Sequence, residues 1–267
     1  MSLIRFRDED GDIHFGVEWD NGEAELLARD PLLGIERTGV MRRVDALLAP
    51  ILPTNIFGIG LNYGRHAEET GLDAPDHPVV FMKATSSVIG PNRAITLPAC
   101  QMNGPEVDYE AELAVIIGSL AKNVSEKDAR RHVLGYTAAN DVSARRWQKS
   151  GGGGQWVRGK SFDTFCPLGP RIVTPAEIGD PQRLTITSRI NGEIMQHGNT
   201  KDMIFSVDAL ISRLSRDLSL LPGTVILTGT PEGVGFVRTP PRFLKPDDEV
   251  AIEIEGIGTL TNPVREA

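Results

Sequence analysis

The architecture of this chain depends most on one segment: Asp108-Tyr109-Glu110-Ala111-Glu112-Leu113-Ala114-Val115-Ile116-Ile117. It ends in an unbroken apolar run, which is typical of a strand covered on both faces. Side chains two residues apart in a strand point to the same face, so Glu110 and Glu112 project together. An edge strand with both carboxylates in water is the alternative, but it does not account for the apolar run. Because two buried like charges are costly without a cation between them, the segment predicts a buried strand carrying part of a cation site.

A third carboxylate, Asp141, stands near the end of a second predicted strand over residues 134–143. Functional groups collect where strands meet loops, although Asn-Asp is also ordinary turn chemistry. With Glu110 and Glu112 it would form a set of three carboxylates without His or Cys. Such hard oxygen ligands favour Mg²⁺, Mn²⁺ or Ca²⁺ over Zn²⁺. The sequence therefore predicts a divalent metal site with positions left open for water or substrate.

Composition limits the class of protein. The 267 residues include 28 Gly and 18 Pro, a share above the average of globular chains, which predicts a fold rich in strands and turns. Hydrophobic residues make up 40% of the chain, enough for a sizeable core. The net charge of -8 argues against a nucleic-acid surface or a basic membrane contact, and no stretch has the length of a membrane span.

The chain divides into two predicted parts. Residues 1–52 contain short strands separated by Asp-Gly and Asn-Gly pairs, the strongest sequence signal for hairpin turns. Pro50 and Pro53 mark a boundary. We therefore expect a small β-rich N-terminal unit, followed by a catalytic domain over residues 53–267.

Helices are predicted at two places in the second part. One lies near residues 125–132, with Ser125 as its N-cap, and the other near residues 206–215. Elsewhere in this part strands predominate, so the fold class that we expect is a strand-rich α+β arrangement.

Cysteine usage and the N-terminal segment bear on the compartment. Cys100 and Cys166 are two cysteines in a chain of this length, which is typical of free thiols in a reducing environment. The first eight residues carry charges and lack the apolar core of a signal peptide. We expect a cytoplasmic protein.

A literal phosphate-binding motif offers a different function. Residues 154–161 fit the G-x-x-x-x-G-K-[ST] pattern, with Lys160 in the lysine position. A true phosphate-binding loop follows a buried strand and opens a helix. Here glycines precede the motif, and Pro167 and Pro170 follow it, where they would break a helix. A nucleotide hydrolase is therefore the less favoured alternative, and the glycines predict a loop suited to covering an active site.

His66 and Glu69 form a candidate catalytic dyad. Residues three apart are neighbours on a helical turn, so the carboxylate can hold the imidazole in one tautomer and raise its basicity. Such a pair can draw a proton from water. An ion pair on a helix surface is the alternative.

Five motifs follow one another over roughly residues 53–264. They are Gly60-Leu61-Asn62-Tyr63-Gly64-Arg65-His66-Ala67-Glu68-Glu69, Asp108-Tyr109-Glu110-Ala111-Glu112-Leu113, Ala139-Asn140-Asp141-Val142-Ser143-Ala144-Arg145, Gly159-Lys160-Ser161-Phe162-Asp163-Thr164-Phe165 and Thr228-Gly229-Thr230-Pro231-Glu232-Gly233-Val234-Gly235. In this order they resemble the motifs of the fumarylacetoacetate hydrolase family, in particular its domain-containing subgroup. The resemblance implies a mixed β-roll that assembles as a homodimer.

The resemblance also implies roles for individual residues. It places the metal on Glu110, Glu112 and Asp141, a catalytic lysine at Lys160, and a short helix bearing His66 and Glu69 that closes over the metal. The residues implied to contact or orient the substrate are Arg145, Gln148 and Thr230. Many family members carry an arginine where this chain has Leu61, so a possible anion contact is absent and the resemblance does not determine the preferred substrate.

The expected function follows from these parts. A 2-oxo acid can chelate the metal, and the dyad can deliver hydroxide to the distal carbonyl of an acylpyruvate, with pyruvate enolate as the leaving group. We therefore expect an acylpyruvate hydrolase that acts on carbon–carbon bonds. The same enolate is reached by oxaloacetate decarboxylation, dioxo-acid isomerisation and 2-oxo-alkenoate hydration, which remain alternatives. A metal-binding or scaffolding protein without turnover is a third class.

Overall fold

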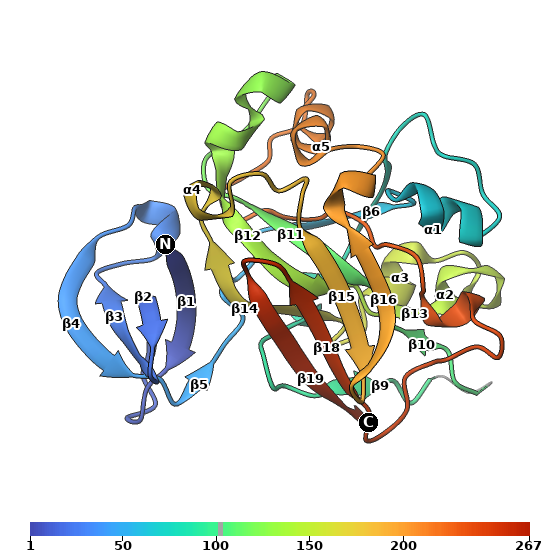
Figure 1. The fold of residues 1–267 in the computed structure, drawn as a ribbon, viewed down its shortest axis with the longest axis horizontal. Coiled ribbons are helices and arrows are strands. Elements are labelled where there is room, and N and C mark those ends of the chain that lie inside the picture. The colour runs from blue at the N-terminus through green and yellow to red at the C-terminus, as the bar shows by residue number, and fades with distance from the viewer. Residues whose placement is uncertain (101–103) are drawn as a thin grey trace.

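The computed structural model describes residues 1–100 and 104–267, and most of its strands belong to one large mixed sheet (Figure 1). In spatial order these strands are β4 (Arg37–Arg43), β3 (Glu23–Leu27), β2 (Ile13–Asp20), β1 (Ser2–Arg7), β14 (Cys166–Val173), β12 (Val133–Asn140), β11 (Ala111–Ile117), β17 (Val225–Leu227), β6 (Ile56–Gly60) and β7 (Val79–Met82), with β5 (Ala46–Leu47) beside β1 and β8 (Val88–Ile89) beside β14. The strand-rich fold expected from composition is thereby confirmed.

A second, five-stranded sheet lies against the middle of the first, and in Figure 1 most of its strands stand in front of β11 and β12. Its strands are β16 (Glu193–Asn199), β15 (Thr185–Ile190), β18 (Glu249–Ile254), β19 (Gly258–Glu266) and β9 (Ile95–Leu97); a separate pair is formed by β10 (Val107–Asp108) and β13 (Ser143–Ala144). Side chains of both large sheets share one apolar cluster, which includes Leu113 and Ile186. The two sheets therefore enclose a common core.

Strand β11 is covered on both faces, as its sequence predicts. All seven of its residues are buried. Leu113 and Val115 pack in the cluster between the sheets, whereas Ala114 and Ile116 belong to a second cluster on the opposite face. The adjacent strand β12 ends at Asn140, directly before Asp141, so the second predicted strand and the position of its carboxylate are also confirmed.

The N-terminal strands form the hairpins expected from the Asp-Gly and Asn-Gly pairs. They stand to one side in Figure 1, yet β1 pairs with β14 of the main body through Ser2 with Val173 and Leu3 with Ile172. The first strands therefore extend the large sheet. The division into a unit of residues 1–52 and a domain of residues 53–267 stays a prediction.

Short helices cover the ends of the sheets. The α-helices are α1 (Gly64–Glu69), α2 (Arg145–Gln148), α3 (Trp156–Lys160), α4 (Pro175–Ile178) and α5 (Val207–Leu214), and the 3-10 helices are η1 (Pro31–Leu33), η2 (Thr85–Ser87), η3 (Glu126–His132), η4 (Ser150–Gly152), η5 (Thr200–Asp202) and η6 (Gly235–Val237). Within the described ranges, no helix is long and apolar enough to cross a membrane.

The two predicted helices have different outcomes. The one near residues 206–215 is α5, and the hydroxyl of Ser206 accepts a hydrogen bond of 3.1 Å from the amide of Ala209, as an N-cap does. The other is η3, a 3-10 helix, and Ser125 makes no capping bond. Its hydroxyl instead donates to the carboxylate of Asp128 at 2.8 Å. Ser125 therefore stands at the predicted N-cap position but makes no capping hydrogen bond, because the side chain three residues on offers a competing acceptor.

Candidate active site

Three carboxylates meet where β11 begins and β12 ends. The antiparallel register sets Ala111 opposite Asn140, so Glu110 and Glu112 flank the position that faces the end of β12, and Asp141 follows directly. Each of the three carboxylates offers an oxygen, and these oxygens lie within 4.8 Å of one another. The sequence placed these residues together, and the structure brings them together.

Buried cations contact two of these carboxylates. Lys160 Nζ, at the end of α3, donates to Glu110 Oε2 and to Asp141 Oδ2, both at 2.6 Å. Lys83 Nζ, directly after β7, donates to Asp141 Oδ1 at 2.6 Å. Burial opposes charge on Glu110, but Lys160 and Arg145 outweigh it and hold the pKa of this carboxyl well below its usual range. Burial likewise opposes the charge on Lys160, yet Asp141 and Glu110 raise its pKa.

Glu112 differs from the other two carboxylates. Burial, followed by the charges of Asp141 and Glu110, raises the pKa of Glu112 well above its usual range. Its Oε2 accepts a hydrogen bond of 2.8 Å from the amide of Gly229, a single neutral donor. The ionised form of Glu112 therefore lacks a countercharge, which a divalent cation would supply. Three convergent carboxylates form a donor set that suits Mg²⁺ or Mn²⁺, so the residues fit a divalent metal.

Arg145 lies beside the carboxylate cluster and is held in place from several sides. Its Nη1 lies 2.7 Å from Glu110 Oε1 and donates to Gln148 Oε1 at 3.0 Å. Its Nε donates to Asp108 Oδ2 at 2.8 Å, and its guanidinium carbon lies 4.4 Å from the ring centre of Phe236. Asp108 is buried and also accepts hydrogen bonds from backbone amides of η6. The guanidinium is thus fixed before any substrate arrives.

The predicted dyad is formed on α1. Nδ1 of His66 and Oε1 of Glu69 lie 2.7 Å apart, and Oε2 of Glu69 accepts a hydrogen bond from the amide of Gly233 at 2.9 Å. With both carboxylate oxygens engaged, Glu69 orients the ring and favours the tautomer with hydrogen on Nδ1. Nε2 of His66 then carries the lone pair, and no protein partner holds it among the described residues.

Thr230 is fixed by a buried glutamine that the sequence did not suggest. The hydroxyl of Thr230 donates to the carbonyl of Ala111 at 2.9 Å and accepts a hydrogen bond of 2.8 Å from Nε2 of Gln196. Gln196 Oε1 in turn accepts from the amide of Ala111 at 3.0 Å. The turn after β17 is therefore tied to the start of β11.

These groups face one cavity of about 280 Å³. Most of the predicted site residues line it: His66, Glu110, Glu112, Arg145, Gln148, Lys160 and Thr230. The other two stand behind the wall, Glu69 as the partner of His66 and Asp141 as the partner of Lys160. Leu61, where the resemblance leads us to expect arginine, is among the apolar lining residues, with Leu72, Phe81 and Trp156. The cavity thus combines a charged side with an apolar side.

Three buried polar residues of the site could not be predicted from the sequence. Lys83 follows a short apolar strand and carries no motif signal, so only the fold reveals that it reaches Asp141. Asp108 stands close to the paired glutamates, but its role depends on the distant Arg145 and on the loop at η6. Gln196, on β16 of the second sheet, forms hydrogen bonds with Ala111 of the large sheet and with Thr230. Such long-range contacts leave no local pattern.

The literal phosphate-binding motif folds differently from a nucleotide site. Lys160 ends the five-residue helix α3 rather than preceding a helix, and its ammonium is engaged by two carboxylates. A phosphate-binding loop needs a strand before the motif and a helix after it. Neither flanks residues 154–161, and β14 follows at Cys166.

Comparisons with known proteins agree with this geometry. Residues 55–265 match the family model described as fumarylacetoacetate (FAA) hydrolase C-terminal. The mitochondrial oxaloacetate tautomerase fahd2 of Xenopus laevis is 47% identical over 244 residues, which cover 91% of this chain and 76% of that protein. The mitochondrial oxaloacetate tautomerase FAHD2A of Homo sapiens is 45% identical over 246 residues, covering 92% of this chain and 77% of that protein.

Solved structures share the fold over its whole length. The 5-carboxymethyl-2-hydroxymuconate delta-isomerase of Mycobacterium smegmatis superposes with a TM-score of 0.87 at 40% identity, covering 100% of both chains. The 2-hydroxyhepta-2,4-diene-1,7-dioate isomerase of Mycobacterium marinum gives a TM-score of 0.85 at 42% identity, covering 100% of this chain and 98% of the other. The expected α+β fold is confirmed, and these relatives bear the names of tautomerases and isomerases.

Proposed function

This chain belongs to the fumarylacetoacetate hydrolase family, and from its site we propose that it is a metal-dependent isomerase that interconverts the keto and enol forms of a small 2-oxo acid. Oxaloacetate is the first candidate, because similar proteins are named as its tautomerases. One observation carries the proposal: a single cavity of about 280 Å³ is lined by two clustered carboxylates, two fixed cations and a histidine with an available nitrogen, and the third carboxylate of the cluster, Asp141, lies directly behind its wall. The expectation of acylpyruvate hydrolysis becomes the second candidate.

The cavity fits a short dianionic substrate. Pockets for drug-sized ligands usually measure about 300–1000 Å³, so a cavity of about 280 Å³ suits an acid of a few carbons. Arg145 would attract a carboxylate by its charge, and Gln148 at its side would offer a hydrogen-bond donor to it. Where the family resemblance leads us to expect arginine, this chain has Leu61, so the distal part of the substrate meets an apolar surface.

Stabilisation of the enolate would fall to the charged side of the cavity. A divalent metal held by Glu110, Glu112 and Asp141 would supply Lewis acidity and polarise the 2-oxo group. Lys160 lies against the same carboxylates, so its ammonium would stabilise negative charge on the oxygen as the carbon acid loses its proton. Lys83, on the far side of Asp141, would hold that carboxylate in position.

Proton transfer would fall to His66. Nε2 would accept the proton from the carbon next to the 2-oxo group, and Glu69 would stabilise the imidazolium through Nδ1. Delivery of that proton to the enolate oxygen would give the enol, and in the reverse direction loss of the enol O–H proton and protonation of the carbon would give the keto form. The step requires no water molecule as a reactant.

Acylpyruvate hydrolysis is the second candidate, and the same dyad supports it. If a water molecule rather than the substrate stood next to Nε2 of His66, proton transfer would produce hydroxide for attack on a distal carbonyl. Carbon–carbon cleavage would follow, with the pyruvate enolate stabilised as before. The two candidates therefore differ in what His66 deprotonates.

A panel of substrates decides between them. Purified protein with Mg²⁺ should accelerate the ketonisation of enol-oxaloacetate, which is measured as the loss of the ultraviolet absorbance of the enol. It should also exchange the C3 protons of oxaloacetate with deuterium from the solvent. Acetylpyruvate should yield pyruvate and acetate slowly or not at all. Rapid cleavage of acetylpyruvate without ketonisation of oxaloacetate would establish the hydrolase instead, and turnover of ATP alone would refute both.

The compartment and the assembly of this chain remain predictions. The similar curated proteins are named as mitochondrial, whereas the cytoplasm was our expectation from the sequence. We keep the cytoplasm as a prediction for this chain, to be checked by fractionating cells that express it. The homodimer is likewise an expectation from the family.

A further inference from the structure

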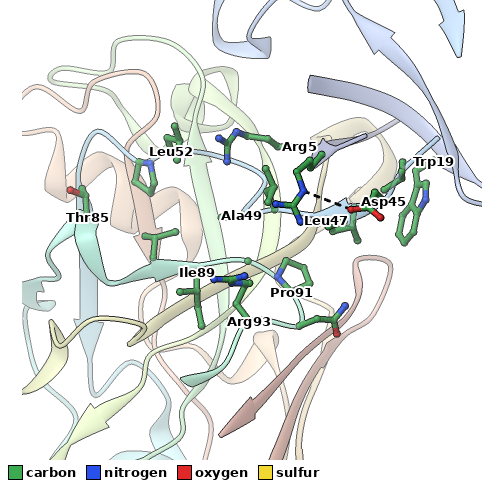
Figure 2. A pocket seen from close by; sticks show the side chains of 18 of the residues that line it. Arg5, Trp19, Asp45, Leu47, Ala49, Leu52, Thr85, Ile89, Pro91 and Arg93 are labelled. Carbon is green, nitrogen blue, oxygen red and sulfur yellow. Dashed lines mark ion pairs between the residues drawn. The ribbon is translucent and has the colours of Figure 1, made fainter. Parts of the chain in front are cut away.

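A second cleft lies away from the active site, beside the N-terminal strands. It measures about 1150 Å³, and β1, the segment around β5 and residues 85–93 form its walls. Figure 2 places Arg5 and Arg93 on opposite sides of it, with Ala49 and Ile89 nearby. From this arrangement we propose that the cleft binds a small organic anion that carries two or more carboxylate or phosphate groups.

The charge of the cleft supports an anionic ligand. Arg5, Arg7 and Arg93 line it together with one acidic residue, Asp45. Arg7 Nε lies 3.7 Å from Asp45 Oδ2, a loose pair in which both side chains are about half exposed. Within the described part of the chain, no hydrogen bond or ion pair engages the guanidinium of Arg5 or of Arg93. The cleft thus carries a local excess of positive charge in a chain with a net charge of -8.

Arg5 is the strongest single indication. Burial lowers its pKa, and the charge of Asp30 offsets this in part. A partly desolvated guanidinium without a close counterion carries an energetic cost that a bound anion would remove. Its planar donors match a carboxylate or a phosphate through two parallel hydrogen bonds.

The walls of the cleft are fixed in place. The carbonyl of Arg5 accepts a hydrogen bond of 2.9 Å from the amide of Leu48, which ties β1 to the second wall. The side-chain amide of Asn262, which is buried, donates to the carbonyls of Gly90 at 3.0 Å and of Arg93 at 2.8 Å. A Cβ on Gly90 would meet the amide nitrogen of Ala49 at 2.4 Å, so only glycine permits this close approach. The site is therefore preformed, which reduces the entropy lost on binding.

Size and lining define the ligand class further. The cleft is far larger than the active-site cavity, and its floor and sides include Leu52, Val88 and Ile89. An inorganic ion would leave this apolar surface uncovered. A ligand with an organic skeleton between two anionic groups would reach both Arg5 and Arg93.

Isothermal titration calorimetry with two probes tests the proposal. Succinate represents a ligand with two carboxylates and propane-1,3-diyl bisphosphate a ligand with two phosphates, each titrated into the protein with Mg²⁺ at constant ionic strength. We expect saturable binding of at least one probe, and the tighter one identifies the anionic group. Arg5→Gln and Arg93→Gln should each weaken it about 10- to 100-fold, the range expected for a lost hydrogen bond to a charged group. Binding of neither probe would overturn the proposal.

Two control measurements locate the bound probe. Arg42→Gln removes the same charge from β4, outside the cleft, and should bind the probe as the unchanged protein does. Arg5→Gln and Arg93→Gln should keep kcat/KM, since neither residue lines the active-site cavity. If Arg145→Gln abolished binding while Arg5→Gln did not, the probe would occupy the active site and the proposal would be wrong.

Discussion

Glu112 and Asp141 belong to one cluster, but neighbouring charges disfavour the ionised form of Glu112 and stabilise that of Asp141. Burial and two like charges raise the pKa of Glu112, whereas Asp141 contacts both Lys83 and Lys160. Glu112→Ala should therefore abolish Mg²⁺-dependent turnover and leave the protein folded. Asp141→Ala should abolish turnover and also lower the free energy of unfolding by about 3–5 kcal/mol, the cost of leaving buried charge unpaired.

Activity assays and urea unfolding of both variants check this contrast. Glu126→Ala, at an exposed position of η3, is a matched control that should change neither quantity. Full Mg²⁺-dependent activity in the Glu112 variant would refute the metal assignment. Equal losses of stability in the two variants would refute the distinction between a repelled and a paired carboxylate.

The variant His66→Ala distinguishes two roles for this residue, proton transfer to and from the substrate and closure of the cavity. His66→Ala should lower ketonisation of enol-oxaloacetate by about 10² to 10⁴, the usual effect of a lost general base. Binding of oxalate, an analogue of the enolate, should persist, since the charged side of the cavity is intact. If oxalate binding fell as far as turnover, His66 would close the cavity rather than move a proton. Titration calorimetry beside the kinetic assay distinguishes these outcomes.

Individual site residues could be predicted from the sequence where two reactive side chains are spaced so that a strand or a helix brings them together. Glu110 and Glu112 share a face because a strand alternates, and His66 and Glu69 meet because a helix turns. Lys83 had no such pattern, because a lone lysine after a strand is usually in solvent. Its 2.6 Å contact with Asp141 spans 58 positions of sequence.

At the scale of elements, the short helix η6 is linked through Asp108 to Arg145, the arginine that we propose binds the substrate. The amide of Gly235 donates to Asp108 Oδ1 at 2.8 Å, and a Cβ on Gly235 would meet that atom at 2.5 Å and the carbonyl oxygen of Arg242 at 2.1 Å. Gly235→Ala should displace Asp108 and loosen Arg145. We expect KM for oxaloacetate to rise about tenfold or more, as for a weakened charged hydrogen bond.

Gly64→Ala is the matched control for this change. A Cβ there meets no atom within 4 Å, so KM should stay the same. Steady-state kinetics of both variants measure the effect. An unchanged KM in Gly235→Ala would mean that η6 does not position Arg145.

Secondary structure was predicted correctly for β11, where the burial of apolar side chains determines the strand. The helix type of η3, where little apolar surface is buried, was not predicted. The unbroken apolar run of β11 required cover on both faces, and both faces are covered. The segment of η3 carries several charges and little apolar surface, so local side-chain contacts such as that between Ser125 and Asp128 decided its form. Propensity alone does not separate a 3-10 helix from an α-helix there.

For the whole molecule, the family resemblance predicts a homodimer. Gel filtration with light scattering should give about twice the chain mass of 29.0 kDa. The mass should not change with Mg²⁺, because the carboxylate cluster is buried inside one chain. A single species of 29.0 kDa would refute the expectation. Composition had predicted the strand-rich class, but it could not predict that the first strands would extend the main sheet through β14.

The buried carboxylates have internal counterions, which are Lys83, Lys160 and Arg145. These counterions bear on the order in which the chain folds and binds its metal. A site that balances most of its own charge does not need a metal to hold the chain together, unlike domains that are unfolded until they are loaded. The polypeptide should mature as a stable apoprotein and acquire its ion afterwards. Chelator should therefore remove activity but preserve cooperative thermal unfolding, and added Mg²⁺ should restore turnover without refolding. Loss of the unfolding transition in chelator would show that the ion is structural. With an apoprotein that is stable without its ion, the supply of metal in the cell would control the activity of this enzyme without changing its abundance.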